Sequence, residues 1–180
     1  MKRGPTLHIV LHEPEIPNNT GNIGRTCVAL GCALHLIHPL GFELSEKACR
    51  RAGLDYWPRL DVREHESLGA YFGTERPARL WLLTTKAARP AWDADLRAGD
   101  HLLFGRETRG LPDEVLARFP DRALSLPMVA GERSLNLATA VCAAAYEGVR
   151  QMVARGDLSI DPQGRLHPPD LAQLGRDAAE

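Results

Sequence analysis

Three polar segments that contain glycine carry the side chains best suited to chemistry. They are residues 18–25 (NNTGNIGR), 105–111 (GRETRGL) and 131–136 (GERSLN). Glycine lets the main chain approach a ligand closely, while Asn, Ser and Arg supply directional hydrogen-bond donors. Any one of these segments could be an ordinary turn or helix cap. Three of them in one chain favour a site for a nucleotide-like or phosphate-bearing ligand.

Several familiar motifs are incomplete or absent. Residues 105–110 have the G-x-x-x-x-G spacing of a P-loop, but Leu111 and Pro112 stand where Lys and Ser or Thr must hold phosphates. The dinucleotide fingerprint G-x-G-x-x-G does not occur, which argues against a nicotinamide or flavin enzyme of the Rossmann type. Ser134 lacks the G-x-S-x-G elbow of a hydrolase nucleophile. The ligand must therefore be bound in another way.

Two pairs of histidines raise a metal hypothesis. His8 and His12 fall on one side of an expected strand, and His35 and His38 lie near the end of another. Metal sites need three or four convergent ligands, and no His or Cys pair here has zinc-finger or H-E-x-x-H spacing. We therefore expect ordinary core or surface histidines and no metal site.

Composition limits the class of protein. The chain has 180 residues, 22 basic against 23 acidic, and 44% hydrophobic residues, which is enough to bury a core. No apolar run approaches the roughly 20 residues of a membrane span, so we expect a cytoplasmic protein. None of the four cysteines forms a C-x-x-C pair, which predicts reduced, packed thiols: Cys27, Cys32, Cys49 and Cys142.

Strands and helices are expected to alternate along the chain. Apolar, β-rich runs predict strands at residues 7–11, 34–38, 79–85, 102–104 and 123–126. Helices are expected from the capping residues 18–20 to Gly31, between Ser45 and Gly53, from Pro112 onward, and over 135–154. This order predicts an α/β fold with a mostly parallel sheet, whose ligands bind at the carboxyl ends of the strands. Residues 1–155 would form one domain, and 156–180 a loosely held tail.

Basic residues gather near the expected site. Residues 47–63 hold five basic against two acidic side chains, with Tyr56 and Trp57 between them. Basic and aromatic side chains suit phosphate contact and base stacking, although a solvated helix face explains about half of such runs. Further positive charge stands beside the three segments: Lys86, Arg89, Arg106, Arg109 and Arg133. The distribution favours a polyanionic substrate.

The three segments resemble, in order, the motifs of the SpoU branch of the SPOUT RNA methyltransferases. N-x-G-x-x-x-R occurs at residues 19–25, F-G-x-E-x-x-G-L at 104–111, and S-L-N-L at 134–137. The flanking runs 11–17 and 50–56 are similar to the TrmL-like subgroup, which methylates the wobble ribose of certain tRNAs. The resemblance covers about residues 7–152 and leaves the tail outside.

The resemblance implies a fold, a cofactor and an assembly. The fold would be a SPOUT-type α/β knot, a parallel sheet flanked by helices with a deep trefoil knot in the C-terminal half. S-adenosylmethionine would lie bent in the knot, cradled by the main chain around Leu83, Gly105, Leu126 and Ser134. The long last helix would help to build a homodimer. The chemistry would need no metal.

The resemblance also implies roles for single residues. Arg25 would be catalytic beside the ribose 2′-hydroxyl, and Asn19, Glu107 and Asn136 would order the site. Because a guanidinium keeps its proton, the role of a simple base does not suit Arg25. Two alternatives stay open: Arg25 orients the hydroxyl, or a substrate phosphate or a neighbouring group accepts the proton while Arg25 holds that geometry. Contacts to RNA are expected from four basic residues: Arg50, Arg51, Lys86 and Arg109.

Three hypotheses follow for the function. The first is S-adenosylmethionine-dependent methylation of the ribose 2′-hydroxyl at the wobble nucleotide of tRNA, a cytidine or a modified uridine. The second keeps this chemistry but places the target at another tRNA position or in ribosomal RNA. The third is a catalytically silent RNA-binding module, against which the intact Arg25, Glu107 and Asn136 argue.

Overall fold

A parallel sheet forms the centre of the molecule. The structure, a computed structural model, describes residues 4–43 and 54–167. Six parallel strands pair in the order β3-β2-β1-β5-β4-β6, and they comprise β1 (His8–His12), β2 (Ala33–Ile37), β3 (Asp61–His65), β4 (Leu80–Leu83), β5 (His101–Phe104) and β6 (Ala123–Leu124). The chain first builds outward from β1 to β3 and then builds the other half, so the order reverses between β1 and β5. The expected α/β class is confirmed.

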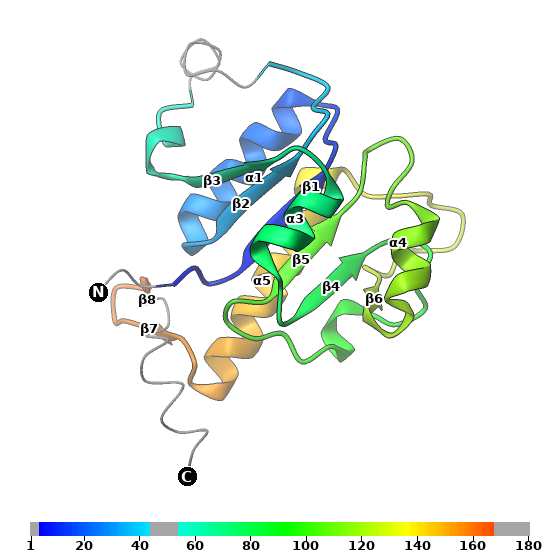
Figure 1. Cartoon of the computed structure of the whole chain (residues 1–180). Coiled ribbons are helices and arrows are strands. Elements are labelled where there is room, and N and C mark those ends of the chain that lie inside the picture. The colour runs from blue at the N-terminus through cyan, green and yellow to red at the C-terminus, as the bar shows by residue number, and fades with distance from the viewer. Residues whose placement is uncertain (1–3, 44–53, 168–180) are drawn as a thin grey trace.

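Helices cover both faces of this sheet (Figure 1). One face packs against α1 (Pro17–Leu30) and α5 (Leu137–Arg155), and the other packs against α3 (Leu68–Glu75) and α4 (Asp113–Arg118). Short 3-10 turns lie between these elements at Trp57–Arg59, Ala91–Asp93 and Pro120–Arg122. The strands therefore form the middle layer of three, which explains their nearly continuous apolar sequences.

The two faces of each strand alternate along the chain. In β1, Ile9 and Leu11 face the core of α1 and α5, whereas Val10 faces Tyr71 in the core of α3 and α4. Small residues let α5 pack closely, because a Cβ at Gly148 would lie 3.1 Å from a methyl carbon of Leu7. The long apolar helix face expected over residues 135–154 is thus used against the sheet and α1.

Helix boundaries differ in part from expectation. Gly31 ends α1 in the left-handed region with φ of 67°, as its position predicted. At the other end, α1 begins at Pro17 with Ile16 as its uncapped N-cap residue, so the expected capping by residues 18–20 is wrong. Pro112 is the N-cap of α4 rather than its first helical residue. Asn19 is free of a capping role because its side chain has partners in the site described below.

Some elements had no signal in the sequence. β3 and α3 form where no strand or helix was expected. After Gly156 the chain enters a hairpin of β7 (Ser159–Ile160) and β8 (Leu166–His167), and Leu158 before it is buried. Up to residue 167 this segment therefore contains a short hairpin, although most of its residues are exposed. The helix expected between Ser45 and Gly53 lies entirely outside the described residues.

The cysteines and the hydropathy of the helices agree with the composition. Cys27 and Cys32 are buried free thiols and Cys142 is a partly buried one, while Cys49 is not among the described residues. Burial raises the pKa of the Cys32 thiol to about 12, so that it stays protonated and unreactive near neutral pH. Within the described ranges, no helix is long and apolar enough to cross a membrane.

Candidate active site

A cleft of about 560 Å³ opens where the loops after β1, β4, β5 and β6 meet the start of α5. These loops leave the carboxyl ends of parallel strands, next to the point where the strand order reverses. Ligands of open α/β sheets bind at such a position, and the volume suits a small organic molecule. The cleft brings together all three polar segments that the sequence singled out.

The second segment folds back on its own main chain. The N–H of Arg106 donates to the carbonyl of Gly110 at 3.2 Å, and the N–H of Gly110 donates to the carbonyl of Arg106 at 2.9 Å. A Cβ at Gly105 would overlap the main-chain atoms of Gly110 and Leu111. Gly105 is therefore required by the fold of the loop itself, and it also lines the cleft.

The carboxylate of Glu107 joins this loop to the first segment. Its Oε2 accepts from the N–H of Glu15 at 2.8 Å, and its Oε1 accepts from the N–H of Ile16 at 3.2 Å. Oε1 also accepts from Nδ2 of Asn19 at 3.0 Å. These partners satisfy N–H groups at the uncapped start of α1, where a negative charge is also favoured by the helix dipole.

Asn136 attaches the third segment to the same network. Its Nδ2 donates to Oδ1 of Asn19 at 2.9 Å, while its Oδ1 accepts from the N–H of Ala138 at 2.9 Å and caps α5. The chain Glu107–Asn19–Asn136 therefore fixes both oxygen and nitrogen of the Asn19 amide. Three motifs separated widely in sequence are held by one continuous set of hydrogen bonds.

A second set of contacts braces the first two loops from the other direction. The carboxylate of Glu15 accepts from the N–H of Thr108 at 3.0 Å and from its hydroxyl at 2.9 Å. One residue before Glu107, Arg106 forms an ion pair with Glu13, whose φ of 50° lies in the left-handed region. The loops are thus linked through Glu13, Glu15, Glu107 and their partners.

Positive charge surrounds the cleft. Lys86, Arg106, Arg109 and Arg133 all contribute to its lining. The Nζ of Lys86 lies 2.6 Å from a carboxylate oxygen of Asp113 in an exposed pair. Beside the cleft, burial and the charge of Arg106 lower the pKa of His12, which keeps its imidazole neutral near neutral pH. The field at the opening favours an anionic ligand.

Most of the residues expected at the site line this cleft. They comprise the network residues, the four residues expected around the cofactor and two expected RNA contacts: Asn19, Glu107, Asn136, Leu83, Gly105, Leu126, Ser134, Lys86 and Arg109. Arg50 and Arg51 lie outside the described residues.

Arg25 does not join them in the described part of the chain. It follows Asn19 by six residues on α1, so its side chain leaves the helix on a different face. Its guanidinium lies over the ring of Tyr56, 4.6 Å from the ring centre, and the residue is exposed.

The basic and aromatic run before β3 is only partly available for RNA. Tyr56 is buried and donates its hydroxyl to the carbonyl of Gly21, so the expectation of base stacking by Tyr56 is wrong. Trp57 packs against Gly24, where an added Cβ would lie 2.9 Å from the indole. Arg63 forms ion pairs with Asp61 and Glu75 at 2.9 and 3.0 Å.

Sequence reasoning missed the residues that brace the loops. Glu13, Glu15 and Thr108 were not selected, although Glu13 and Glu15 precede a helix start and Thr108 follows Glu107. The available signal was two acidic side chains just before the start of a helix, where a negative charge is favoured.

Comparison with known proteins places the chain in a family. Residues 6–146 match the SpoU rRNA Methylase family. A tRNA (cytidine(34)-2'-O)-methyltransferase from Saccharophagus degradans is 49% identical over 147 residues, which are 81% of this chain and 96% of that protein. The protein of that name from Escherichia coli K12 is 46% identical over 81% of this chain and 94% of its own length.

Solved structures agree with this assignment. A structure described as giving insight into the 2-OH methylation of C/U34 on tRNA superposes with a TM-score of 0.77 at 53% identity, covering 83% of this chain and 97% of that one. The SpoU methyltransferase AviRb from Streptomyces viridochromogenes, in complex with AdoMet, superposes with a TM-score of 0.71 at 27% identity, covering 85% and 63%. The matched sequence, the shared fold and the three joined motifs show that the chain belongs to the SpoU methylase family.

Proposed function

We propose that this protein transfers a methyl group from S-adenosylmethionine to the ribose 2′-hydroxyl of the wobble nucleotide, a cytidine or a modified uridine, in tRNA. The observation that carries the proposal is that the chain spans more than nine-tenths of relatives named for this activity, at 46–49% identity. The joined motif network and the positive rim of the cleft support the same conclusion.

The cleft fits a nucleoside-like cofactor. Leu83, Leu126 and Leu137 give it apolar walls, while the loop around Gly105 offers main-chain polar groups and Ser134 a hydroxyl. Such a mixture of apolar surface and a few polar groups is typical of small-molecule sites. When bound, S-adenosylmethionine would supply an electrophilic methyl group on a sulfonium sulfur.

Asn19, Glu107 and Asn136 act in this proposal by positioning. Both carboxylate oxygens of Glu107 already accept hydrogen bonds from N–H groups of this chain. Glu107 is therefore poorly suited to accept the proton of the ribose hydroxyl. Its role is to hold the start of α1 and the Asn19 amide in place, which fixes the geometry needed for in-line displacement.

Arg25 is proposed as the residue that orients the ribose hydroxyl or a substrate phosphate. Its exposed guanidinium remains charged, which favours contact with the RNA backbone. A phosphate of the substrate would then be close enough to receive the proton as the new oxygen–carbon bond forms and the carbon–sulfur bond breaks. Arg109 and Lys86 would contact the RNA at the cleft, and Arg50 and Arg51 beyond the described residues.

The assembly and the location belong to the same proposal. A homodimer is supported by the exposure of Tyr146, which leaves an aromatic ring uncovered on α5. The deep trefoil knot is supported by membership of the SpoU family. A tRNA substrate would place the enzyme in the cytoplasm. Sedimentation of the purified chain, expected at twice the mass of one copy, tests the dimer.

One experiment tests both activity and target. The full chain is incubated with labelled S-adenosylmethionine and tRNA that lacks its native modifications, and the methylated nucleotide is mapped by nuclease digestion and mass spectrometry. Fully modified tRNA from a strain without the activity and ribosomal RNA serve as parallel substrates. A ribose methyl at the wobble nucleotide is the expected result. Methyl transfer to another nucleotide or to ribosomal RNA would replace the target, and absence of transfer to every substrate would favour the silent binding module.

A matched pair of variants tests Arg25 in the same assay. Arg25→Ala should abolish methyl transfer while leaving binding of S-adenosylmethionine largely unchanged, because Arg25 lies away from the cleft lining in one copy of the chain. Arg165→Ala removes another exposed arginine, outside the residues that match the family, and should keep full transfer. Near-normal turnover of Arg25→Ala would remove it from the proposed role.

A further inference from the structure

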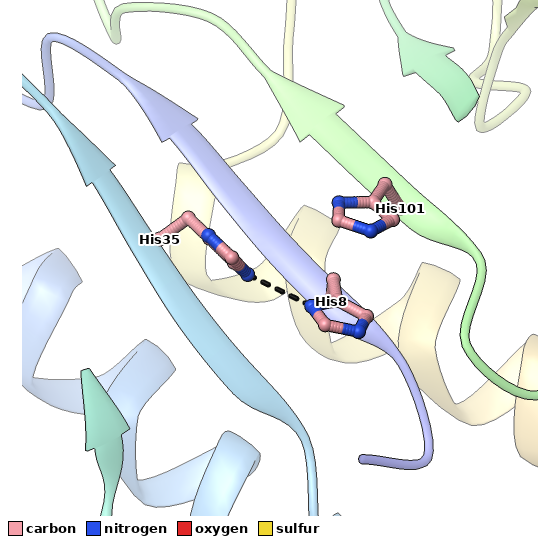
Figure 2. Close-up of side chains that lie close together, drawn as sticks. All are labelled: His8, His35 and His101. Carbon is pink, nitrogen blue, oxygen red and sulfur yellow. Dashed lines mark hydrogen bonds between the residues drawn. The ribbon is translucent and has the colours of Figure 1, made fainter. Parts of the chain in front are cut away.

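Three histidine rings converge on the sheet face that α3 covers, far along the strands from the cleft loops. Figure 2 shows His8 on β1 between His35 on β2 and His101 on β5, all on one face of the sheet. Nδ1 of His8 lies 2.8 Å from Nε2 of His35, and the rings of His8 and His101 stack with centres 4.0 Å apart. One ring nitrogen of each histidine lies within 4.8 Å of one from each of the others.

Strand register brings these rings together. His8 is directly opposite His101 in the parallel pairing of β1 with β5. His35 lies two residues beyond Ala33, the partner of His8 on β2, so it projects to the same face. The sequence had paired His8 with His12 and His35 with His38. The structure gives two of these histidines other partners. Nε2 of His12 lies 3.4 Å from a carboxylate oxygen of Glu13, and Nε2 of His38 lies 2.8 Å from one of Glu64.

The outer nitrogens of two rings already have hydrogen-bond partners, a tyrosine hydroxyl and another imidazole. Nδ1 of His101 bonds the hydroxyl of Tyr71 at 2.7 Å, which leaves Nε2 of His101 for another partner. Nδ1 of His35 bonds Nε2 of His65 at 3.0 Å, and this leaves Nε2 of His35 directed at His8. Metal-bound histidines commonly donate their second N–H in this way, which fixes the tautomer and the ring.

We propose that His8, His35 and His101 form a site for one divalent transition-metal ion of the zinc class, separate from the methyl-transfer cleft. Three imidazoles supply three of four tetrahedral ligands, and water fills the fourth position. His8 is the partly exposed member of the set, so solvent reaches the site at this ring. Ligand nitrogens of a tetrahedral site lie about 3.3 Å apart, so His8 and His35 separate by about 0.5 Å on binding. One of the two stacked rings of His8 and His101 must also rotate, because the lone pairs of parallel rings cannot both point at one ion.

Protonation and charge favour a cation at this position. Burial is the main cause that lowers the pKa of His35 to about 2 and of His101 to about 3, so both rings are neutral at neutral pH and keep a lone pair. Arg63 is the nearby positive group, but it is paired with Asp61 and Glu75. The charges of Arg63, Asp61 and Glu75 sum to −1, and this negative charge compensates part of the charge of a bound ion.

A second set of ligands shares His35 and must be distinguished. His35, His65 and Glu75 also have atoms within 4.8 Å of one another. The carboxylate of Glu75 is already 3.0 Å from Arg63, and both histidines of this set are buried. The set with His8 and His101 needs no carboxylate to leave an arginine and has access to solvent. For these reasons we assign the ion to His8, His35 and His101.

Titration with Zn²⁺ and Co²⁺ tests the site directly. The full chain, prepared without a histidine tag and stripped with EDTA, is titrated by calorimetry with Zn²⁺ and by visible absorption with Co²⁺. We expect one ion per chain, Co²⁺ bands typical of tetrahedral coordination, and a rise in Tm with Zn²⁺ that EDTA reverses. Absence of saturable binding of either ion to the wild-type chain would overturn the proposal.

Single substitutions identify the ligands. His8→Asn and His101→Asn should each weaken Zn²⁺ binding by more than about 100-fold, because loss of an outer partner alone weakens metal affinity about 10- to 100-fold. Tyr71→Phe and His65→Asn, which remove such outer partners, should fall within that smaller range. The surface variants His38→Asn and His167→Asn should bind as the wild type does, since neither residue belongs to the set.

The pattern across these variants decides between the two sets. Loss of binding in His65→Asn with full binding in His101→Asn would assign the ion to the set with Glu75 and overturn the proposal. Equal weakening by the surface variants would indicate adventitious binding and overturn it as well. Thermal unfolding in EDTA shows which variants fold. If His101→Asn does not fold, His8→Asn decides, because this partly exposed residue stands at the beginning of β1.

Discussion

The cleft and the histidine cluster show two different ways in which one sheet assembles polar groups. In the cleft, loops deliver the functional residues after the strands have ended, and each loop carries several of them in a contiguous run. Under α3, the strands themselves deliver single histidines from within their own length. The loop residues owe their positions to hydrogen bonds such as that from Asn136 to Asn19, whereas the histidines owe theirs to strand register.

This difference determines how each region responds to change. Hydrogen-bonded loops depend on each donor and acceptor, so a change of one atom type disturbs the cleft. Register is set by many main-chain bonds, so histidine side chains can change their protonation or ligand without moving the strands. The cleft should therefore be sensitive to substitutions that leave the sheet intact, and the face under α3 should be sensitive to pH.

The largest effect is expected from a methyl-sized addition at Gly105. Gly105→Ala places a Cβ on the main-chain atoms of Gly110 and Leu111, which cannot move as a side chain can. We expect a loss of at least about 3 kcal/mol in the free energy of unfolding and loss of cofactor binding. Gly73→Ala is the control, because its Cβ meets nothing within 4 Å inside α3 and should be neutral or stabilising. Denaturant unfolding of both variants measures the difference. A Gly105→Ala protein as stable as the wild type would contradict the close contact between Gly105 and the main chain of Gly110 and Leu111.

Acidification should destabilise the face under α3. Because the folded chain holds the pKa of His35 at about 2 and of His101 at about 3, the unfolded chain binds more protons between these values and about 6.5. The free energy of unfolding should therefore fall as pH is lowered through this window, by about 4 kcal/mol from about pH 7 to about pH 5 for the two rings.

Unfolding by urea in EDTA at a series of pH values measures this slope. The double variant His35→Gln with His101→Gln should flatten it, since neither amide titrates. His167→Gln, in the exposed hairpin, should keep the wild-type slope. A slope that the double variant leaves unchanged would mean that other groups cause the pH dependence.

Glu107→Gln tests how strongly the cleft depends on its hydrogen-bond network. An amide offers one acceptor oxygen where the carboxylate has two, so at least one of the N–H groups of Glu15 and Ile16 loses its partner. We expect a loss of about 2 kcal/mol in stability and of about 10- to 100-fold in kcat, with less change in KM for tRNA. Glu132→Gln, an exposed residue in the third segment, is the matched control. Steady-state kinetics with both variants would show equal effects only if charge alone, and not the network, were responsible.

The smallest effect on stability is expected at Lys86. Its ion pair with Asp113 is largely exposed, and such pairs contribute between about 0 and 1 kcal/mol. Lys86→Ala should therefore leave the free energy of unfolding nearly unchanged but weaken tRNA binding, with a decrease of about 0.9 in the slope of log affinity against log salt. Filter binding at several salt concentrations tests this, with Arg165→Ala as the control. An unchanged slope would remove Lys86 from the RNA contacts.

The sequence predicted those strands and helices whose own residues show by their hydropathy whether they are buried. β1, β2, β4 and β5 were recognisable because strands buried on both faces are mostly apolar, here with single histidines among the apolar residues. β3 was missed because DVREH lies at the edge of the sheet and is mostly polar. The short helix α3 was missed because its eight residues include two glycines, which weaken any helical pattern.

The same limit applies to the sites. Contiguous motifs identified Asn19, Glu107 and Asn136 before their hydrogen bonds were known. The histidine cluster was not recognisable, because His8 and His101 become neighbours only through the register of β1 with β5. Arg25 shows a different limit, since it shares a motif with Asn19 but does not line the cleft of its own copy of the chain, and its catalytic role stays a prediction.

The position of β1 in the sheet has a consequence for how the chain folds during its synthesis. β1 leaves the ribosome before the other strands of this sheet, and it can pair with β2 soon afterwards. Its other edge stays open until residues 101–104 have been made, because β5 is its second neighbour. Open edges invite wrong pairing, and contacts between distant segments slow folding. A pause in translation between β3 and β5 would therefore prolong the interval in which the nascent chain is most prone to aggregate.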